Sequence, residues 1–409
     1  MKPSRQETDA LPSRGPAVKP QDGLLERNFV LVCLSQLIGY VGNGFITPIF
    51  PLFMTSLGYS ASFTGMSLAA LNAVSFATRP LFGYLVDSGS ARRAQSVAGV
   101  LLAAASLCYI YSSIPVIILG RAIHGLGWGG LNVVGSAWTA YLAPTNRRAE
   151  AMGYYTMVQR VGITISPVLA LWAAGAFGYQ PAFVAAAVCG LGLTVATLQI
   201  AHDRQPPPLS VPFSGPLLRR VIEPGALLGA GLLAISMLSG PAIYAYMPLY
   251  FLELGLEHID MYFLVLGLTG ILARAFLGRW SDRMGRVRSI TAGFGVGALG
   301  LMLIAAATDS LGIIFGGAIF TIGGSLSEPS LYAIAIDRSP AERRGAAMAT
   351  YTMAFQLGGG VGAVLSGFAI EFLGYRWLYL GTVATSLLAL TVVLVGAHRW
   401  HWSASPQHG

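Results

Sequence analysis

The chain has 409 residues, of which 54% are hydrophobic and only 10% charged, and its formal net charge is +8. Soluble domains carry about 25% charged residues, so this composition excludes a soluble globular protein and indicates a membrane protein. The positive charge does not indicate a nucleic-acid partner, because the basic residues cluster in short loops between apolar runs.

Apolar runs of roughly 20 residues, bounded by charged residues or by Pro and Gly, predict roughly twelve membrane-spanning helices. We expect them at 28–56, 60–85, 94–112, 116–142, 149–175, 180–201, 222–252, 259–280, 289–307, 311–337, 345–372 and 376–397. Nearly all Lys and Arg residues outside these runs fall in loops on one side of the membrane, Arg376 being the exception. This bias predicts that both termini are cytoplasmic.

An internal repeat divides the chain into two halves. Three motifs recur at an offset of 196 residues (340 − 144): Pro144-x-x-Arg147-Arg148 as Pro340-x-x-Arg343-Arg344, Ala151-Met152-x-x-Tyr155-Thr156-Met157 as Ala347-Met348-x-x-Tyr351-Thr352-Met353, and Gly178-Tyr179 as Gly374-Tyr375. A fourth motif, Arg79-x-x-x-Gly83-x-x-x-Asp87, recurs at an offset of 195 (274 − 79) as Arg274-x-x-x-Gly278-x-x-x-Asp282. Because each half has an even number of spans, the two halves run in the same direction.

The predicted fold is an all-α membrane protein with two six-helix bundles related by a parallel repeat. We expect a disordered cytoplasmic tail at 1–27, an N-terminal bundle at 28–201, a cytoplasmic linker at 202–221, a C-terminal bundle at 222–397 and a cytoplasmic tail at 398–409. The Pro-rich linker favours an extended connector. The three cysteines stand alone in apolar runs, so neither disulfides nor a metal site are expected.

The loop after the eighth span carries the sequence Gly278-Arg279-Trp280-Ser281-Asp282-Arg283-Met284-Gly285-Arg286-Val287-Arg288. It resembles the G-x-x-x-D-R-x-G-R-x-[KR] signature of the major facilitator superfamily. The copy in the first half, from Gly83 to Arg93, keeps the Gly, the Asp and a basic pair. The resemblance implies a twelve-helix transporter of the cytoplasmic membrane that works by alternating access.

Within these loops, Asp87, Asp282, Arg283 and Arg286, with Gly83 and Gly278, are candidates for a latch that breaks when the two halves rock. The alternative is a loop that only sets topology. In the fifth span, Gly162 to Ala170 resembles the antiporter signature G-x-x-x-G-P-x-x-G around Pro167, with Ser and Ala replacing two glycines. There the alternative is ordinary helix packing by small residues.

The fourth span contains Arg121-Ala122-Ile123-His124-Gly125-Leu126-Gly127, which resembles the R-x-x-[QH]-G-x-G signature of proton-coupled members. An arginine in hydrocarbon costs about 2.5–3.5 kcal/mol, so it usually faces a bundle interior or a cavity. Helical periodicity places Arg121, His124, Trp128 and Asn132 on one face, which we interpret as a wall of the transport path. His124 remains open between a proton carrier, a substrate contact and a packing residue.

Two other ionisable residues are predicted near the middle of the membrane. Glu328 is the repeat counterpart of Asn132, and Arg160 lies about eleven residues into the fifth span. We therefore expect Glu328 to pair with Arg160 rather than with Arg121, which lies nearer the periplasm. Arg79 and Arg274 are expected near the cytoplasmic ends of their spans, where they would snorkel.

Proton coupling by Glu328, with Arg160 and His124, is the leading hypothesis. Desolvation favours the protonated acid when Glu328 is unpaired, whereas a nearby Arg160 favours the carboxylate. The alternative is a fixed ion pair that only joins the two halves.

The candidate substrate cavity combines polar and aromatic residues, with two deep arginines against one deep carboxylate. That balance favours anionic or zwitterionic cargo. The candidates are Arg121, Asn43, Trp128, Asn132, Tyr155, Gln159, Tyr244, Tyr332 and Gln356. Arg121 and His124 have no polar counterpart in the second half, which points to an outer site for cargo or gating.

The sequence predicts a proton-driven exporter of a small organic molecule in the cytoplasmic (inner) membrane. We expect a monomer in the lipid bilayer that uses the proton gradient and no cofactor, metal or nucleic acid. One alternative is a proton-coupled uptake symporter for an organic acid or sugar, and another is a membrane receptor or assembly partner that does not transport. No nucleophile–base set, phosphate loop or metal spacing indicates an enzyme.

Overall fold

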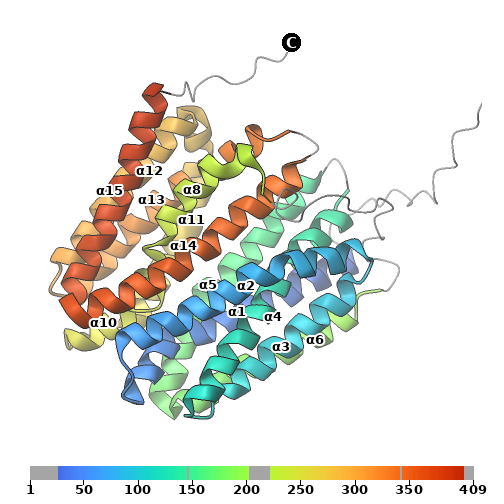
Figure 1. The fold of residues 1–409 in the computed structure, drawn as a ribbon, viewed down its shortest axis with the longest axis horizontal. Coiled ribbons are helices and arrows are strands. Elements are labelled where there is room, and N and C mark those ends of the chain that lie inside the picture. The colour runs from blue at the N-terminus through green and yellow to red at the C-terminus, as the bar shows by residue number, and fades with distance from the viewer. Residues whose placement is uncertain (1–25, 145–146, 202–221, 341–342, 400–409) are drawn as a thin grey trace, which may run out of the picture.

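The computed structural model describes residues 26–144, 147–201, 222–340 and 343–399. The predicted linker at 202–221 lies outside the described residues, as does nearly all of the predicted tails at 1–27 and 398–409. Within each half, successive long helices are joined by short connections and run in opposite directions (Figure 1).

The first half consists of six helices that lie within a few residues of the predicted spans. They are α1 (Arg27–Ser56), α2 (Ala61–Asp87), α3 (Ala91–Cys108), α4 (Ile114–Leu142), α5 (Arg148–Phe177) and α6 (Tyr179–Leu198). We call the end of the molecule where α1 begins the near end, and the opposite end, where α2 begins, the far end.

The second half repeats this order except at its first span. Its long helices are α11 (Ile259–Met284), α12 (Arg286–Ala306), α13 (Ser310–Asp337), α14 (Arg344–Leu373) and α15 (Tyr375–Arg399). The span predicted at 222–252 is helical in this region but is not one continuous helix. It is divided into η3 (Pro224–Ala226), α8 (Leu227–Met237), α9 (Gly240–Tyr244) and α10 (Met247–Glu253).

The breaks in this segment have a local cause. Pro241 and Pro248 are the second residues of α9 and α10. Proline lacks the backbone N–H that a continuous helix would use, whereas the first turn of a new helix leaves that N–H unpaired in any case. The apolar pattern identified the segment, but its two prolines decide where each helix begins.

Nine helices of the described residues are long and apolar enough to cross a membrane. These are α1, α4, α5, α6 and α11 to α15. A length of about 20 apolar residues matches the thickness of the bilayer core. The chain is therefore an all-helical membrane protein, with further helices packed among these nine.

The internal repeat is visible in the ends of α5 and α14. The residues that precede these helices, Arg147 and Arg343, and the residues that follow them, Gly178 and Gly374, stand at the same offset of 196. Both glycines have positive φ, of 83° and 87°. Side chains rarely adopt that conformation, so glycine permits the same sharp reversal in both halves.

The two halves meet mainly along two pairs of helices, α2 with α14 and α5 with α11. In Figure 1, α2 and α14 run side by side between the two groups of helices. Glycines allow the close approach. A Cβ on Gly65 would lie 2.3 Å from the carbonyl oxygen of Ala363, and one on Gly267 would lie 1.9 Å from the Thr164 side chain.

Polar contacts between the halves also join the beginning of α2 to the second half. The Tyr246 hydroxyl donates to the carbonyl oxygen of Ala61 at 2.9 Å. The backbone N–H of Ser62 donates to Oε2 of Glu371 at 3.1 Å, so this carboxylate occupies the positive end of the α2 dipole. The halves are thus in contact at the far end.

We predict that Gly65→Ala destabilises the protein, because the added methyl group must displace the α14 backbone. Overpacking of this kind costs about 1–3 kcal/mol. The matched control is Gly231→Ala in α8, where a Cβ would meet no atom within 4 Å. Thermal unfolding in detergent, followed by intrinsic fluorescence, should show a lower Tm for the first variant only. Equal Tm values for both variants would contradict the close contact.

Candidate transport site

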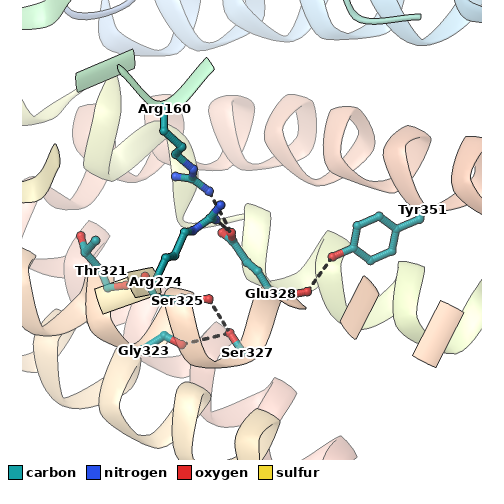
Figure 2. A network of polar contacts seen from close by, with 9 residues as sticks. Arg160, Arg274, Thr321, Gly323, Ser325, Ser327, Glu328 and Tyr351 are labelled. Carbon is teal, nitrogen blue, oxygen red and sulfur yellow. Dashed lines mark hydrogen bonds and ion pairs between the residues drawn. The ribbon is translucent and has the colours of Figure 1, made fainter. Parts of the chain in front are cut away.

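A cluster of three charged residues joins the two halves in the interior of the protein. Oε2 of Glu328 in α13 accepts from Nη2 of Arg160 in α5 at 3.0 Å and from Nη2 of Arg274 in α11 at 2.6 Å. Figure 2 shows both guanidinium groups converging on this carboxylate. We call Arg160, Arg274 and Glu328 the charge cluster. It carries two cations and one anion, and the bond to Arg160 crosses between the halves.

The backbone of Glu328 is also engaged. The Tyr351 hydroxyl of α14 donates to the Glu328 carbonyl oxygen at 3.3 Å (Figure 2). The side chains of the charge cluster remain about one-third exposed, at 34% for Arg160, 33% for Arg274 and 30% for Glu328. The cluster is therefore held in place by bonds from three helices and is only partly buried.

The pairing of Glu328 with Arg160 agrees with the sequence-based expectation, but the expectation for Arg274 is wrong. Arg274 does not snorkel to a helix end. Its guanidinium bonds Glu328 instead, although the apolar part of α11 ends at Leu277, three residues further.

A small cavity adjoins the charge cluster on the far-end side. Its lining combines polar and apolar groups, including Arg160, Thr164, Tyr244, Gly267 and Thr321. These residues come from α5, α9, α11 and α13, so the cavity lies where the two halves meet. Tyr244 is the predicted cavity residue that the structure brings to the charge cluster.

Arg121 lies elsewhere, in the first half. It is 2% exposed, and its guanidinium carbon lies 3.1 Å from the centre of the Phe50 ring and 5.0 Å from that of Tyr109. Its Nε and Nη2 atoms have no hydrogen-bond partner among the described residues. The aromatic faces compensate part of the cost of this buried cation.

His124 bridges two side chains of the same half. Its Nε2 lies 3.0 Å from Oδ1 of Asn43, and its Nδ1 lies 3.2 Å from the Tyr109 hydroxyl. Because an amide oxygen only accepts, we assign the proton to Nε2, so that Nδ1 accepts from tyrosine. A neutral imidazole satisfies both contacts, beside a small cavity that His124 lines with Asn43 and Ser106.

Trp128 and Asn132 continue the same face of α4 and also contact α1. The Tyr40 ring packs edge-on against Trp128, with centroids 4.9 Å apart, and its hydroxyl donates to Oδ1 of Asn132 at 2.6 Å. The predicted stripe therefore shares one face, as expected. That face packs against α1 within the first half.

The other predicted cavity residues are not gathered at the charge cluster. The Tyr155 hydroxyl donates to the carbonyl oxygen of Asn132 at 3.4 Å and also bonds the Gln159 side chain. Tyr332 is 40% exposed and packs edge-on against Tyr351. Gln356 is buried.

The predicted latch residues lie near the near end. Arg286, at the start of α12, forms an ion pair with Asp337 at the end of α13, within the second half rather than between the halves. Arg283 is exposed in the last turn of α11. Pro167, in the antiporter-like stretch of the fifth span, lies inside α5. A Cβ on Gly83 would meet no atom within 4 Å.

The contacts of three predicted latch residues lie outside the described part of the structure. The side chains of Asp87 and Asp282 fall outside the described part of the structure, as do the surroundings of Gly278 in α11.

Sequence reasoning missed four residues of these sites. Arg274 and Tyr351 bond Glu328, while Phe50 and Tyr109 enclose Arg121. The repeat contained a signal for Tyr351, since it is the counterpart of Tyr155. No signal in a single helix identifies Phe50 and Tyr109, because they belong to other helices.

Two groups of membrane-length helices that meet at a charge cluster are typical of α-helical membrane transporters. The chain belongs to the Major Facilitator Superfamily, whose family model it matches over residues 32–308 and 263–408. The protein is accordingly a transporter rather than an enzyme.

Curated relatives cover most of the chain at low identity. An uncharacterized MFS-type transporter of Methanocaldococcus jannaschii is 24% identical over 375 residues, which span 87% of this chain and 95% of the relative. The staphylopine export protein of Staphylococcus aureus is 21% identical over 375 residues, which span 88% of this chain and 93% of the relative.

Solved structures share the fold. A POT family transporter in complex with a thioalcohol-conjugated peptide superposes with a TM-score of 0.75 at 13% identity, covering 91% of this chain and 96% of the other. The POT family transporter PepTSo superposes with a TM-score of 0.74 at 13% identity, covering 92% of this chain and 99% of the other. At this identity the likeness establishes the fold alone.

We predict that Glu328→Gln destabilises the protein more than Arg160→Gln. The first change leaves two arginines without their carboxylate, whereas the second keeps the bond between Arg274 and Glu328. Hydrogen bonds to charged groups contribute about 1.5–3 kcal/mol when buried, and partial exposure reduces this to roughly 1–2 kcal/mol for Glu328→Gln. The measurement is thermal unfolding in detergent.

The control for this comparison is Glu150→Gln, which breaks an exposed ion pair with Arg147 in the first turn of α5. Its Tm should stay close to that of the native protein. A larger loss of stability in Arg160→Gln than in Glu328→Gln would show that the carboxylate is not the centre of the cluster.

Proposed function

We propose that the protein exports a small anionic or zwitterionic organic molecule across the cytoplasmic membrane in exchange for protons. The charge cluster carries this proposal, because it joins the halves through one titratable carboxylate and retains an excess of positive charge. The relative named as a staphylopine export protein supports the direction of transport.

The proposed architecture has twelve membrane spans in two six-helix bundles, at 28–201 and 222–397, with both termini in the cytoplasm. The segment from η3 to α10 counts as one broken span. The equal offsets at the ends of α5 and α14 support two related bundles. The bias of Lys and Arg supports cytoplasmic termini, so the near end would face the cytoplasm.

In the proposed mechanism, Glu328 exchanges its bond to Arg160 for a proton. Protonation removes the negative charge that attracts both arginines, so the link between α5 and α13 weakens. A zwitterionic cargo would place its cationic group on the Glu328 carboxylate and its own carboxylate near the arginines, so cargo and proton compete for the same group. Protonation of Glu328 then releases the cargo, and cargo binding releases the proton, as exchange requires.

The contacts at the far end fit loading of cargo from the cytoplasm. Tyr246 and Glu371 join the second half to the start of α2, which corresponds to the periplasmic side in the proposed orientation. A transporter closed on that side receives cargo from the other. Export then requires these contacts to break while the near end closes.

We predict that Glu328→Gln uncouples transport from the proton gradient. A cargo is first identified as a carboxylate-bearing metabolite whose intracellular level falls when the protein is expressed. In proteoliposomes, the variant should retain cargo exchange between the two sides but lose at least about tenfold in pH-gradient-driven uptake, because glutamine cannot release a proton.

Glu150→Gln serves as the control, since its ion pair with Arg147 is exposed and lies outside the cluster. It should keep both activities. If gradient-driven uptake by Glu328→Gln equals that of the native protein, Glu328 is not the coupling residue.

A further inference from the structure

The cavity beside the charge cluster has room for one small polar group. Its volume is about 30 Å³, and its polar lining consists of Arg160, Thr164, Tyr244 and Thr321. We call this space the cluster cavity. A buried water needs roughly 10–15 Å³, so the cavity suits the head group of a molecule rather than a whole cargo molecule. Because Arg160 also bonds Glu328, an occupant of the cavity contacts the charge cluster directly.

Two hydrogen-bond donors of the cluster cavity are unused. Within the described residues, the Arg160 guanidinium bonds only Glu328, through Nη2. The Tyr244 hydroxyl bonds none of the residues that the structure describes, although it lines the cavity. None of the lining residues is acidic. The free donors beside a cation therefore favour an anion in this space.

The two threonines of the lining offer the opposite hydrogen-bonding character. The Thr164 hydroxyl donates to the carbonyl oxygen of Arg160 at 2.8 Å, and the Thr321 hydroxyl donates to that of Gly317 at 2.9 Å. A hydroxyl has one proton to donate, so both oxygens can only accept from a further group. A ligand that satisfies the whole lining must carry an anion and, next to it, a donor.

The charge of the lining indicates which donor fits. An ammonium group would add a second cation beside Arg160, and no lining residue supplies a carboxylate to compensate it. Like charges at short distance repel, most strongly away from water. A hydroxyl donates to the same threonine oxygens without adding charge. The lining therefore favours a hydroxyl group over an amino group.

The cavity is open because α11 has a glycine at its wall. A Cβ on Gly270 would lie 3.4 Å from Cγ2 of Thr321, so a longer side chain at this position would project beside the threonine. Gly270 precedes Arg274 by four residues, which places both on one face of α11. The repeat counterpart of Gly270 in α2 is Ser75, at the offset of 195 (270 − 195). The glycine is thus particular to the second half.

We propose that the cluster cavity binds the α-hydroxy carboxylate head group of the cargo, with the carboxylate on Arg160 and Tyr244 and the hydroxyl on the threonine oxygens. Arginine presents planar donors that match a carboxylate. The rest of the cargo, including the cationic group of a zwitterion, extends from the cavity to Glu328. This inference deepens the proposed function and rests on it for the identity of the ligand as cargo.

The first test compares two small acids that differ by one hydroxyl group. Equilibrium binding of radiolabelled lactate to the purified full-length protein should be at least about tenfold tighter than binding of propionate, because the threonine oxygens gain a donor only from lactate. Alanine, with an amino group in place of the hydroxyl, should bind more weakly than lactate. Thr321→Val should lower the affinity for lactate and leave that for propionate unchanged.

The second test removes the donors of the carboxylate. Tyr244→Phe should weaken lactate and propionate binding alike, by about tenfold, as expected for a bond to a charged group. Its Tm in detergent should not fall, because the lost hydroxyl has no partner within the described residues. Arg160→Gln should weaken both acids more strongly. The control is Tyr111→Phe, whose hydroxyl belongs to a residue that is 64% exposed, and it should bind both acids as the native protein does.

The third test fills the cavity. Gly270→Val should weaken lactate binding at least about tenfold, and Gly270→Ala should weaken it less. Gly295→Val in α12 is the matched control, because a Cβ there would meet no atom within 4 Å. If Gly270→Val lowers the Tm so far that binding cannot be compared, Tyr244→Phe and Thr321→Val still decide the result.

Three results overturn the proposal: no lactate binding to the native protein, equal affinity for lactate and propionate, or unchanged lactate binding in Tyr244→Phe. Binding is measured without a gradient, and lactate has no cation for Glu328, so Glu328→Gln should bind lactate at least as tightly as the native protein. Weakened lactate binding in Tyr244→Phe, together with unchanged gradient-driven transport by Glu328→Gln, would support the head-group site and reject the coupling mechanism.

Discussion

One carboxylate shared by two arginines is the interaction on which the arrangement of the two halves depends. Glu328 accepts from Arg274 within its own half and from Arg160 of the other half, at 2.6 and 3.0 Å. Neither arginine can be fully neutralised by a single shared anion, so the cluster attracts further negative charge. The bond to Arg160 therefore links the halves, and the excess positive charge of the cluster favours a further anion.

Much of the fold follows from the spacing of apolar residues and from the internal repeat. These two patterns located the long helices and, with the helical rise, placed Glu328 opposite Arg160. These two patterns gave wrong predictions where a single residue breaks a helix or takes an unexpected partner. Pro241 and Pro248 divide the first span of the second half, and Arg274 bonds Glu328 instead of extending to the membrane surface.

The candidate site was less predictable because periodicity describes one helix at a time. It showed that Arg121 and His124 share a face of α4, but the partner of that face depends on how helices pack. Phe50 encloses Arg121 from α1, and Asn43 of the same helix bonds His124. The comparison of the two halves was more informative, because it identified a position where one half has an acid and the other an amide.

The two polar contacts at the far end engage the main chain of α2, the carbonyl oxygen of Ala61 and the N–H of Ser62. Main-chain atoms are present whatever the side chain, so the bond to Ala61 survives a substitution at that residue. The side chains of Ser62 and Ser60 also bond Glu371, so substitutions of these serines weaken the contact. The partners Tyr246 and Glu371 have no such protection. Substitutions of Tyr246 or Glu371 would therefore change how firmly the halves meet at the far end, without altering the helix α2 that these residues contact.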